Sequence, residues 1–144
     1  MDIGIIRATA ADADTIVRMV RELAESSGGT SGVDGEYVGR YLGFPGRTIL
    51  LAEVAGERVG LLAFSLDPNL YHAGDGCLIE DLFVRPAWRG RGVGRALVAH
   101  VMTEAARQGW AEVSVSTDRD NRAALSLYRG VGLVEEYTLL EKHF

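Results

Sequence analysis

The segment that most constrains the fold of this chain is residues 82–108, in which a strand-like run, a glycine-rich loop and an apolar helical pattern follow one another directly. The apolar run 82–84 is typical of a buried strand, and Pro86, which cannot donate to a sheet ladder, ends it. Three glycines then occupy alternate positions, and apolar residues recur at helical spacing over 92–108. Gly109 is a suitable C-terminal cap. The sequence therefore predicts a strand, a tight loop and a helix in succession.

The loop between this strand and helix is a candidate site for a phosphorylated ligand. Free N–H groups at the start of a helix and the positive end of its dipole attract anions, and glycines let the ligand approach the backbone closely. Four arginines that can add charge-assisted contacts lie in the same stretch: Arg85, Arg89, Arg91 and Arg95. The P-loop pattern is excluded because no Gly-Lys-Ser/Thr follows. The dinucleotide pattern G-x-G-x-x-G/A fails because Arg95 or Leu97 stands where Gly or Ala is needed.

The hydrophobic pattern along the rest of the chain predicts an α/β fold, with a mixed sheet and helices on its faces. Strands are expected over residues 2–8, 48–54, 59–66, 77–84 and 112–117, with one or two more within 133–142. Helices are expected over residues 11–25, 35–42, 92–108 and 121–129. Residues 55–58 have the composition of a hairpin turn, and residues 67–76, which include Pro68 and Asn69, are expected to form a loop.

Length and composition indicate one globular domain spanning residues 1–144. The chain is 47% hydrophobic and 24% charged, which is ordinary for a globular protein. No apolar run approaches the roughly 20 residues that cross a bilayer, and the first residues lack a signal-peptide pattern, so we expect a cytoplasmic protein without membrane contact. The net charge of −5 argues against nucleic acid as a partner. Because Cys77 is the only cysteine, no disulfide framework or cysteine metal cluster is expected, and nothing else implies a metal.

Two motifs in the expected order resemble the GNAT superfamily of N-acetyltransferases. Arg89, Gly92 and Gly94 fit the pattern Arg/Gln-x-x-Gly-x-Gly/Ala of that superfamily's coenzyme A loop, and residues 121–133 are similar to its next motif. The segment from Ile6 to Asp14 is similar to the superfamily's opening strand and helix, so that the resemblance covers nearly the whole chain. The run Glu80-Asp81-Leu82-Phe83-Val84 is similar to the matching strand of diamine and some antibiotic acetyltransferases.

The resemblance implies a mixed, mostly antiparallel sheet with helices on both faces and a splayed central strand pair. It also implies acetyl-CoA as co-substrate, with the pantetheine arm held beside the fourth strand and the pyrophosphate on the amides of the loop. Asn121 would bind or orient the pantetheine from the facing helix. The residues that the resemblance assigns to acetyl-CoA are Leu82, Phe83, Val84, Arg89, Gly90, Arg91, Gly92, Val93, Gly94, Arg95, Ala96 and Asn121.

Acetyl transfer to an amine also requires an acid and a base. By resemblance, Tyr128 protonates the leaving thiolate; the alternative is a helix tyrosine that only packs on the sheet. Glu80 is the candidate base and Asp81 a substrate contact, although Glu80 can instead attract a cationic amine or pair with a loop arginine while water takes the proton. As successive strand residues they face opposite sides of a sheet unless a bulge intervenes. Tyr37 and Tyr41 are candidate acceptor contacts.

The function predicted from these residues is acetyl-CoA-dependent transfer of an acetyl group to a primary amine, by direct attack on the thioester. The acidic strand pair and the overall acidity favour a small cationic amine as the partner. Two alternatives remain open: acetylation of a protein N-terminus or lysine, and a non-catalytic module that binds acyl-CoA. The resemblance also allows a homodimer.

Overall fold

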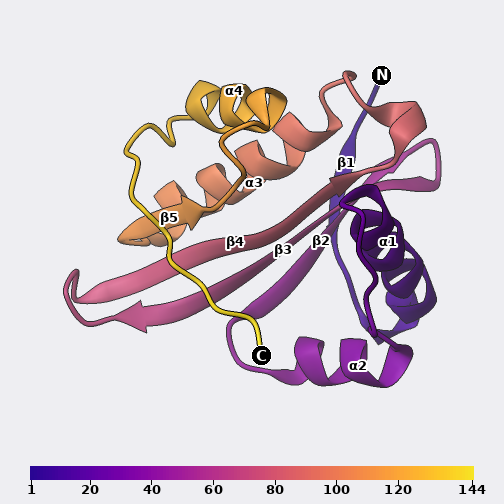
Figure 1. Cartoon of the computed structure of the whole chain (residues 1–144), viewed down its shortest axis with the longest axis horizontal. Helices are drawn as coiled ribbons and strands as arrows, with labels where there is room; N and C mark the ends of the chain where they lie inside the picture. Colours follow the sequence, from indigo (N-terminus) through magenta and orange to yellow (C-terminus); the bar gives the residue numbers. More distant parts are fainter.

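The computed structural model describes residues 1–144 and contains a five-stranded sheet with strands in sequence order, β1-β2-β3-β4-β5 (Figure 1). The first four strands pair antiparallel, and β4 and β5 pair parallel. The strands are β1 (Gly4–Arg7), β2 (Arg47–Val54), β3 (Glu57–Asn69), β4 (Gly74–Val84) and β5 (Glu112–Val115). The helices are α1 (Ala13–Ser26), α2 (Gly35–Gly43), α3 (Val93–Gln108) and α4 (Arg122–Gly130). Short 3-10 turns cover Ala10–Asp12 and Pro86–Trp88. This confirms the predicted α/β class.

Helices cover both faces of the sheet, as expected (Figure 1). On one face α3 and α4 pack on the strands through a core that includes Leu97, Val101 and Tyr128. On the other face α1 and α2 pack through a second core that includes Ile16 and Val38. In both cores the apolar stripe of each helix packs on apolar strand residues. Burying one such side chain stabilises the fold by about 1.5–3 kcal/mol. No helix is long and apolar enough to span a membrane.

Gly60 in β3 lets α3 approach the sheet closely. A Cβ atom at this position would lie 2.9 Å from Cγ1 of Val93 and 3.2 Å from Cδ1 of Leu97. Both of these side chains are fully buried. Because the neighbouring atoms are close-packed, the position accepts only a hydrogen. The first turn of α3, which carries the glycine loop, is thereby held against the middle of the sheet.

The splayed strand pair is present between β4 and β5. The two strands pair only from Gly76 to Ile79 on β4, opposite Glu112 to Val115 on β5. β4 continues to Val84, and beyond Ile79 its only partner strand is β3. One edge of the end of β4 is therefore free, next to the loop that enters α3.

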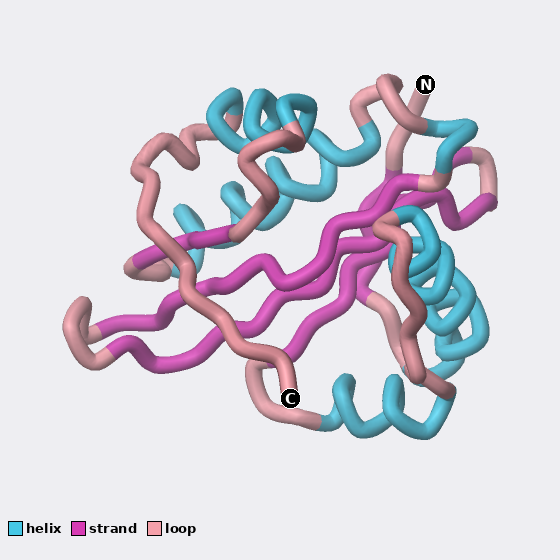
Figure 2. Tube along the Cα trace, in the orientation of Figure 1, coloured by secondary structure: helices cyan, strands magenta, loops and turns pink.

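Two predictions about chain organisation are wrong. Residues 67–76 are not a loop, because β3 extends to Asn69 and β4 begins at Gly74, which leaves a short turn at the tip of a long hairpin. No strand forms within residues 133–142, where the structure has neither helix nor strand (Figure 2). An apolar run forms a strand only where it pairs with another strand. Here Tyr137 and Leu140 remain 89% and 88% exposed.

Candidate active site

A β-bulge in β4 shapes the candidate site. Ala63 of β3 pairs with Asp81 and the next residue, Phe64, pairs with Ile79, so Glu80 is an extra residue in β4. The bulge reverses the alternation of side chains along the strand. Ile79 packs in the core under α3, whereas Phe83, four positions later, packs in the core under α1 and α2. An uninterrupted strand would have placed these two residues on one face.

The bulge brings both acidic residues to the side of α2. The hydroxyl of Tyr41 donates a hydrogen bond to Oε1 of Glu80 across 3.3 Å. Burial raises the pKa of the Tyr41 hydroxyl, and the charges of Glu80 and, more weakly, Asp81 raise it further. Tyr41 therefore remains protonated and acts as a donor. In a regular strand Glu80 and Asp81 would face opposite sides of the sheet. The bulge, which the sequence analysis named as the exception, places both on the same side.

Asp81 differs from an ordinary surface carboxylate. Burial of its carboxyl raises its pKa, and the neighbouring charge of Glu80 adds to the rise, although part of the residue remains exposed. Two carboxylates close together attract a cation more strongly than either would alone. This pair is chemically suited to bind an ammonium group and to accept its proton.

The glycine loop presents a row of free amides at the start of α3. Gly90 and Gly92 have left-handed backbone conformations, with φ of 73° and 85°. A Cβ atom at either position would meet nothing within 4 Å, so the space in front of the loop is open. Neither a backbone nor a side-chain acceptor takes the N–H groups of residues 90–95. The first amide engaged is that of Ala96, which donates to the Gly92 carbonyl at 3.0 Å. Such a row of donors fits a pyrophosphate.

The loop arginines have different positions. The side chain of Arg89 turns back onto β4, where its Nε donates to the Val84 carbonyl at 2.9 Å and its guanidinium carbon lies 5.8 Å from the centre of the Phe83 ring. Arg91 and Arg95 are exposed. The Arg91 guanidinium stacks over Trp88 at 5.2 Å from the ring centre. Arg89 thus ties the loop to the end of β4, while Arg91 and Arg95 lie on the solvent side.

The start of α3, the end of β4 and α4 converge at Gly94. A Cβ atom there would lie 3.1 Å from Cδ1 of Leu127 in α4 and 3.6 Å from Cγ2 of Val84 in β4. Tyr128, the next residue of α4, is buried in the core beside α3. Burial raises the pKa of its phenol, and its hydroxyl makes no hydrogen bond within the protein. Tyr128 is therefore a protonated phenol in the core that α3 and α4 share with the sheet.

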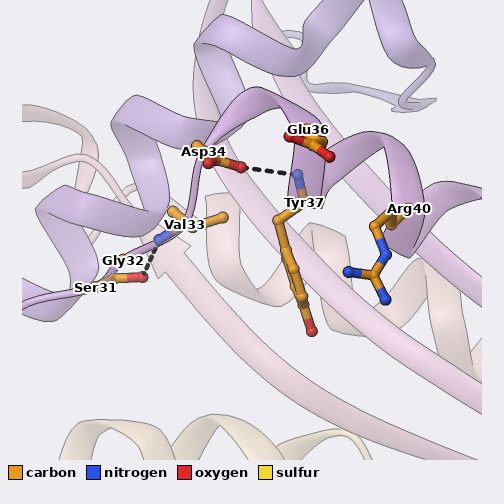
Figure 3. Close-up of a pocket in the computed structure, with 7 residues that line it drawn as sticks. All are labelled: Ser31, Gly32, Val33, Asp34, Glu36, Tyr37 and Arg40. Atoms are coloured by element: carbon orange, nitrogen blue, oxygen red, sulfur yellow. Dashed lines mark hydrogen bonds between the residues drawn. The ribbon is translucent and has the colours of Figure 1, made fainter.

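Asn121 and Tyr37 have local roles in the structure. The side-chain oxygen of Asn121 accepts the Ala124 N–H at 3.1 Å and caps α4. Tyr37 is 55% exposed and does not join Tyr41 at Glu80. It lines an open hollow of about 520 Å³ at the start of α2, between Asp34 and Arg40 (Figure 3). Asp34 caps this helix by accepting the Tyr37 N–H at 2.9 Å.

Sequence reasoning missed Arg47, the first residue of β2, which belongs to the same surroundings as Tyr41. Its guanidinium pairs with Asp67 of β3 at 3.1 Å and interacts electrostatically with Glu80 and Tyr41. The only sequence signal for Arg47 is its position at the start of a strand. Its position relative to β4 depends on two strand registers, β2 with β3 and β3 with β4, which the sequence alone does not reveal.

Comparisons with known proteins identify the family. Residues 17–133 match the acetyltransferase (GNAT) family. A thialysine N-epsilon-acetyltransferase of Sus scrofa is 30% identical over 132 residues, which cover 84% of this chain and 78% of that protein. An L-2,4-diaminobutyric acid acetyltransferase of Nocardia farcinica is 32% identical over 88 residues, which cover 61% of this chain and 44% of that protein. The chain thus spans less than half of the diaminobutyric acid enzyme.

A solved structure shares the whole fold. An aminoglycoside acetyltransferase from an uncultured soil metagenomic sample has a TM-score of 0.84 at 22% identity, over 99% of this chain and 95% of that chain. The resemblance found in the sequence is therefore confirmed at the level of the fold and of the family. On the family match over residues 17–133 and the similarity to the porcine enzyme, this chain belongs to the GNAT family of acetyltransferases.

Proposed function

We propose that this chain transfers the acetyl group of acetyl-CoA to a primary amine of a small cationic molecule. The observation that carries the proposal is the bulge at Glu80, which places two carboxylates directly before the free edge of β4. An amine held by these carboxylates lies beside the strand edge at which the family's pantetheine arm pairs. The names of the relatives and the structural neighbour support an amine acceptor, since each of them specifies an amino group.

The residues present fit acetyl-CoA at the glycine loop. The free amides of residues 90–95 would hold the pyrophosphate, and Arg91 and Arg95 would add charge at the exposed side of the loop. Leu82 to Val84 offer an unpaired strand edge to the pantetheine arm. Asn121, whose side-chain oxygen already caps α4, would use its amide NH₂. The thioester of acetyl-CoA supplies the activated acetyl group.

The protein's own groups would manage the protons of the transfer. Glu80 would take the proton of the bound ammonium, directly or through water, so that the neutral nitrogen can attack the thioester carbonyl carbon. The new C–N bond forms, the C–S bond breaks, the nitrogen releases its second proton to solvent, and Tyr128 gives its phenolic proton to the departing sulfur. The products are the acetylated amine and coenzyme A, and solvent restores Glu80 and Tyr128 to their starting states.

The cytoplasmic location and the homodimer expected from the sequence remain parts of this proposal. The experiment that tests the proposal is mass spectrometry of reactions containing the protein, acetyl-CoA and a panel of polyamines, diamino acids, aminoglycosides and short peptides. We expect a singly acetylated small amine. Acetylation confined to peptides would favour a protein substrate, and binding of acetyl-CoA without any product would favour a non-catalytic module. Gel filtration of the same sample tests the homodimer.

A further inference from the structure

Arg47 and the acidic pair lie on the same side of the sheet. In the strand register Arg47 of β2 pairs with Ser65 of β3, and Ser65 pairs with Leu78 of β4. The bulged Glu80 follows two residues after Leu78. Tyr41 of α2 stands over this part of the sheet, because it donates to Glu80 at 3.3 Å and also interacts electrostatically with Arg47.

The Arg47 guanidinium is held in place but only half used. One nitrogen, Nη1, makes every hydrogen bond of the side chain: to the two carboxylate oxygens of Asp67 at 3.1 and 3.3 Å, and to the Pro45 carbonyl at 3.3 Å. Nη2 and Nε donate to no protein group and are not sealed from solvent. The side chain is 28% exposed. A fixed guanidinium with two free donors on one edge matches a carboxylate, which such an edge binds through two parallel hydrogen bonds.

Positive and negative groups therefore flank Tyr41 in a fixed order. Glu80 and Asp81 lie on β4, and the free edge of Arg47 lies on β2. A polyamine would meet the attraction of the carboxylates and the repulsion of the guanidinium. A molecule that carries both an ammonium and a carboxylate would satisfy both ends.

We infer that the acceptor is an amino acid, whose reacting amine is taken by Glu80 and Asp81 and whose carboxylate is bound by Nη2 and Nε of Arg47. This inference rests on the proposed function. It makes Arg47 a specificity-determining residue and Asp67, together with the Pro45 carbonyl, the groups that position it.

The separation of the two ends selects the amine that reacts. Strands β2 and β4 are two strand spacings apart, which is about 10 Å between backbones. The side chains of Arg47 and Glu80 extend into this gap, and Tyr41 lies beside both. An acceptor that bridges them therefore fits best with several bonds between its carboxylate and its reacting amine, as at the side-chain amine of a diamino acid, rather than the two bonds that separate an α-amine from its carboxylate carbon. We expect acetylation at the side-chain amine.

Matched pairs of acceptors with and without a carboxylate test the inference. The pairs are L-lysine and cadaverine, L-ornithine and putrescine, and L-2,4-diaminobutyrate and 1,3-diaminopropane. We expect kcat/KM to be at least about tenfold higher for the amino acid in one or more pairs, because a charge-assisted contact to the carboxylate is gained. Arg47→Gln should lower kcat/KM for that amino acid about 10- to 100-fold more than for its diamine, through KM, and Arg47→Lys should retain part of the preference.

The control is Arg18→Gln, which removes the same charge from an exposed position of α1 and should leave the preference unchanged. The inference is overturned if the diamine is used as well as the amino acid in every pair, if Arg47→Gln lowers both acceptors alike, or if the product carries the acetyl group on the α-amine. Coenzyme A release with diamines alone would overturn this inference while the proposed function stands. Release with no amine at all would overturn both.

Discussion

The hydroxyl of Tyr41 donates a hydrogen bond to Oε1 of Glu80 across 3.3 Å and thereby joins helix α2 to the bulge of strand β4. The two residues are separated by 39 positions in the chain. The bulge turns Glu80 towards the helix, and the burial of Tyr41 keeps its phenol protonated. This contact links the element expected to shape the acceptor site with the strand expected to hold the thioester.

Tyr41→Phe removes the donor to Glu80 without changing the packing of the ring. We expect KM for the amine to rise about tenfold, since Glu80 loses an orienting hydrogen bond, and a hydrogen bond to a charged group is worth about 1.5 kcal/mol or more. Steady-state kinetics of coenzyme A release measure it. Tyr37→Phe is the control, because Tyr37 lies on the same helix, is exposed and has no side-chain hydrogen bond. Equal effects of the two substitutions would contradict the role given to Tyr41.

Asp81→Asn should stabilise the protein at neutral pH. The pKa of Asp81 is raised in the folded state, so its contribution to stability is greatest below the ordinary carboxyl pKa of about 3.9 and is lost as pH rises through the higher folded value. The amide lacks this penalty. Urea unfolding at pH 7 should therefore show a higher free energy of unfolding for Asp81→Asn, and the difference should shrink as the pH falls towards 4. A stability difference between Asp81→Asn and the parent that grows as the pH falls would contradict a raised pKa of Asp81.

The same substitution should weaken capture of the amine. Because protonation of Asp81 removes one of the two negative charges, kcat/KM of the parent should fall on acidification at a pH above the range of an ordinary carboxyl. Asp81→Asn should be slower at neutral pH and lose this part of the pH profile. The measurement is kcat/KM against pH for both proteins; two profiles of identical shape would show that Asp81 does not contribute.

Gly60→Ala should destabilise the fold by about 1–3 kcal/mol, which is typical of overpacking in a close-packed core. The added methyl group would stand 2.9 Å from Val93 and push on the first turn of α3. Thermal and urea unfolding measure the change. Gly4→Ala in β1 is the matched control, since its Cβ would have an ordinary contact of 3.8 Å with the Glu53 carbonyl. Equal stability of the two variants would contradict the close approach of α3 at Gly60.

Gly92→Ala should weaken acetyl-CoA binding. Gly92 has φ of 85°, a left-handed conformation that costs a residue with a side chain roughly 1–2 kcal/mol. If the backbone of the variant rotates to relieve this strain, the free N–H groups of the loop and of the first turn of α3 change direction. Isothermal titration calorimetry should give a higher Kd for acetyl-CoA. Gly39→Ala in α2, which has open space around it, is expected to leave the Kd unchanged. An unaltered Kd in Gly92→Ala would argue against the loop as the pyrophosphate site.

Much of this architecture follows from local pattern. The glycines between Val84 and Val93 predicted the strand, loop and helix in their observed order, because a proline stop, left-handed turns and helical periodicity are all local properties. The helices also end near their expected positions. Signals of this kind need no knowledge of what lies across the sheet.

The remaining features depend on pairing between distant segments. Nothing in the run around Glu80 marks the bulge, which is defined only against Ala63 and Phe64 of β3. Arg47 joins the site through two successive strand registers. The strand expected within residues 133–142 is absent for the same reason, because an apolar run becomes a strand only when it pairs with another segment, and this run pairs with none.

The most direct test of the central claim is the initial rate of coenzyme A release from acetyl-CoA, with and without amine acceptors, for the parent, Glu80→Gln and Tyr128→Phe. We predict release that requires an amine and that falls roughly 100-fold or more in each variant, as for loss of a general base or acid, with the Kd for acetyl-CoA retained. Tyr137→Phe, at an exposed position, should behave as the parent. Amine-dependent release at parental rates in both variants, or no release with any primary amine, would contradict the account.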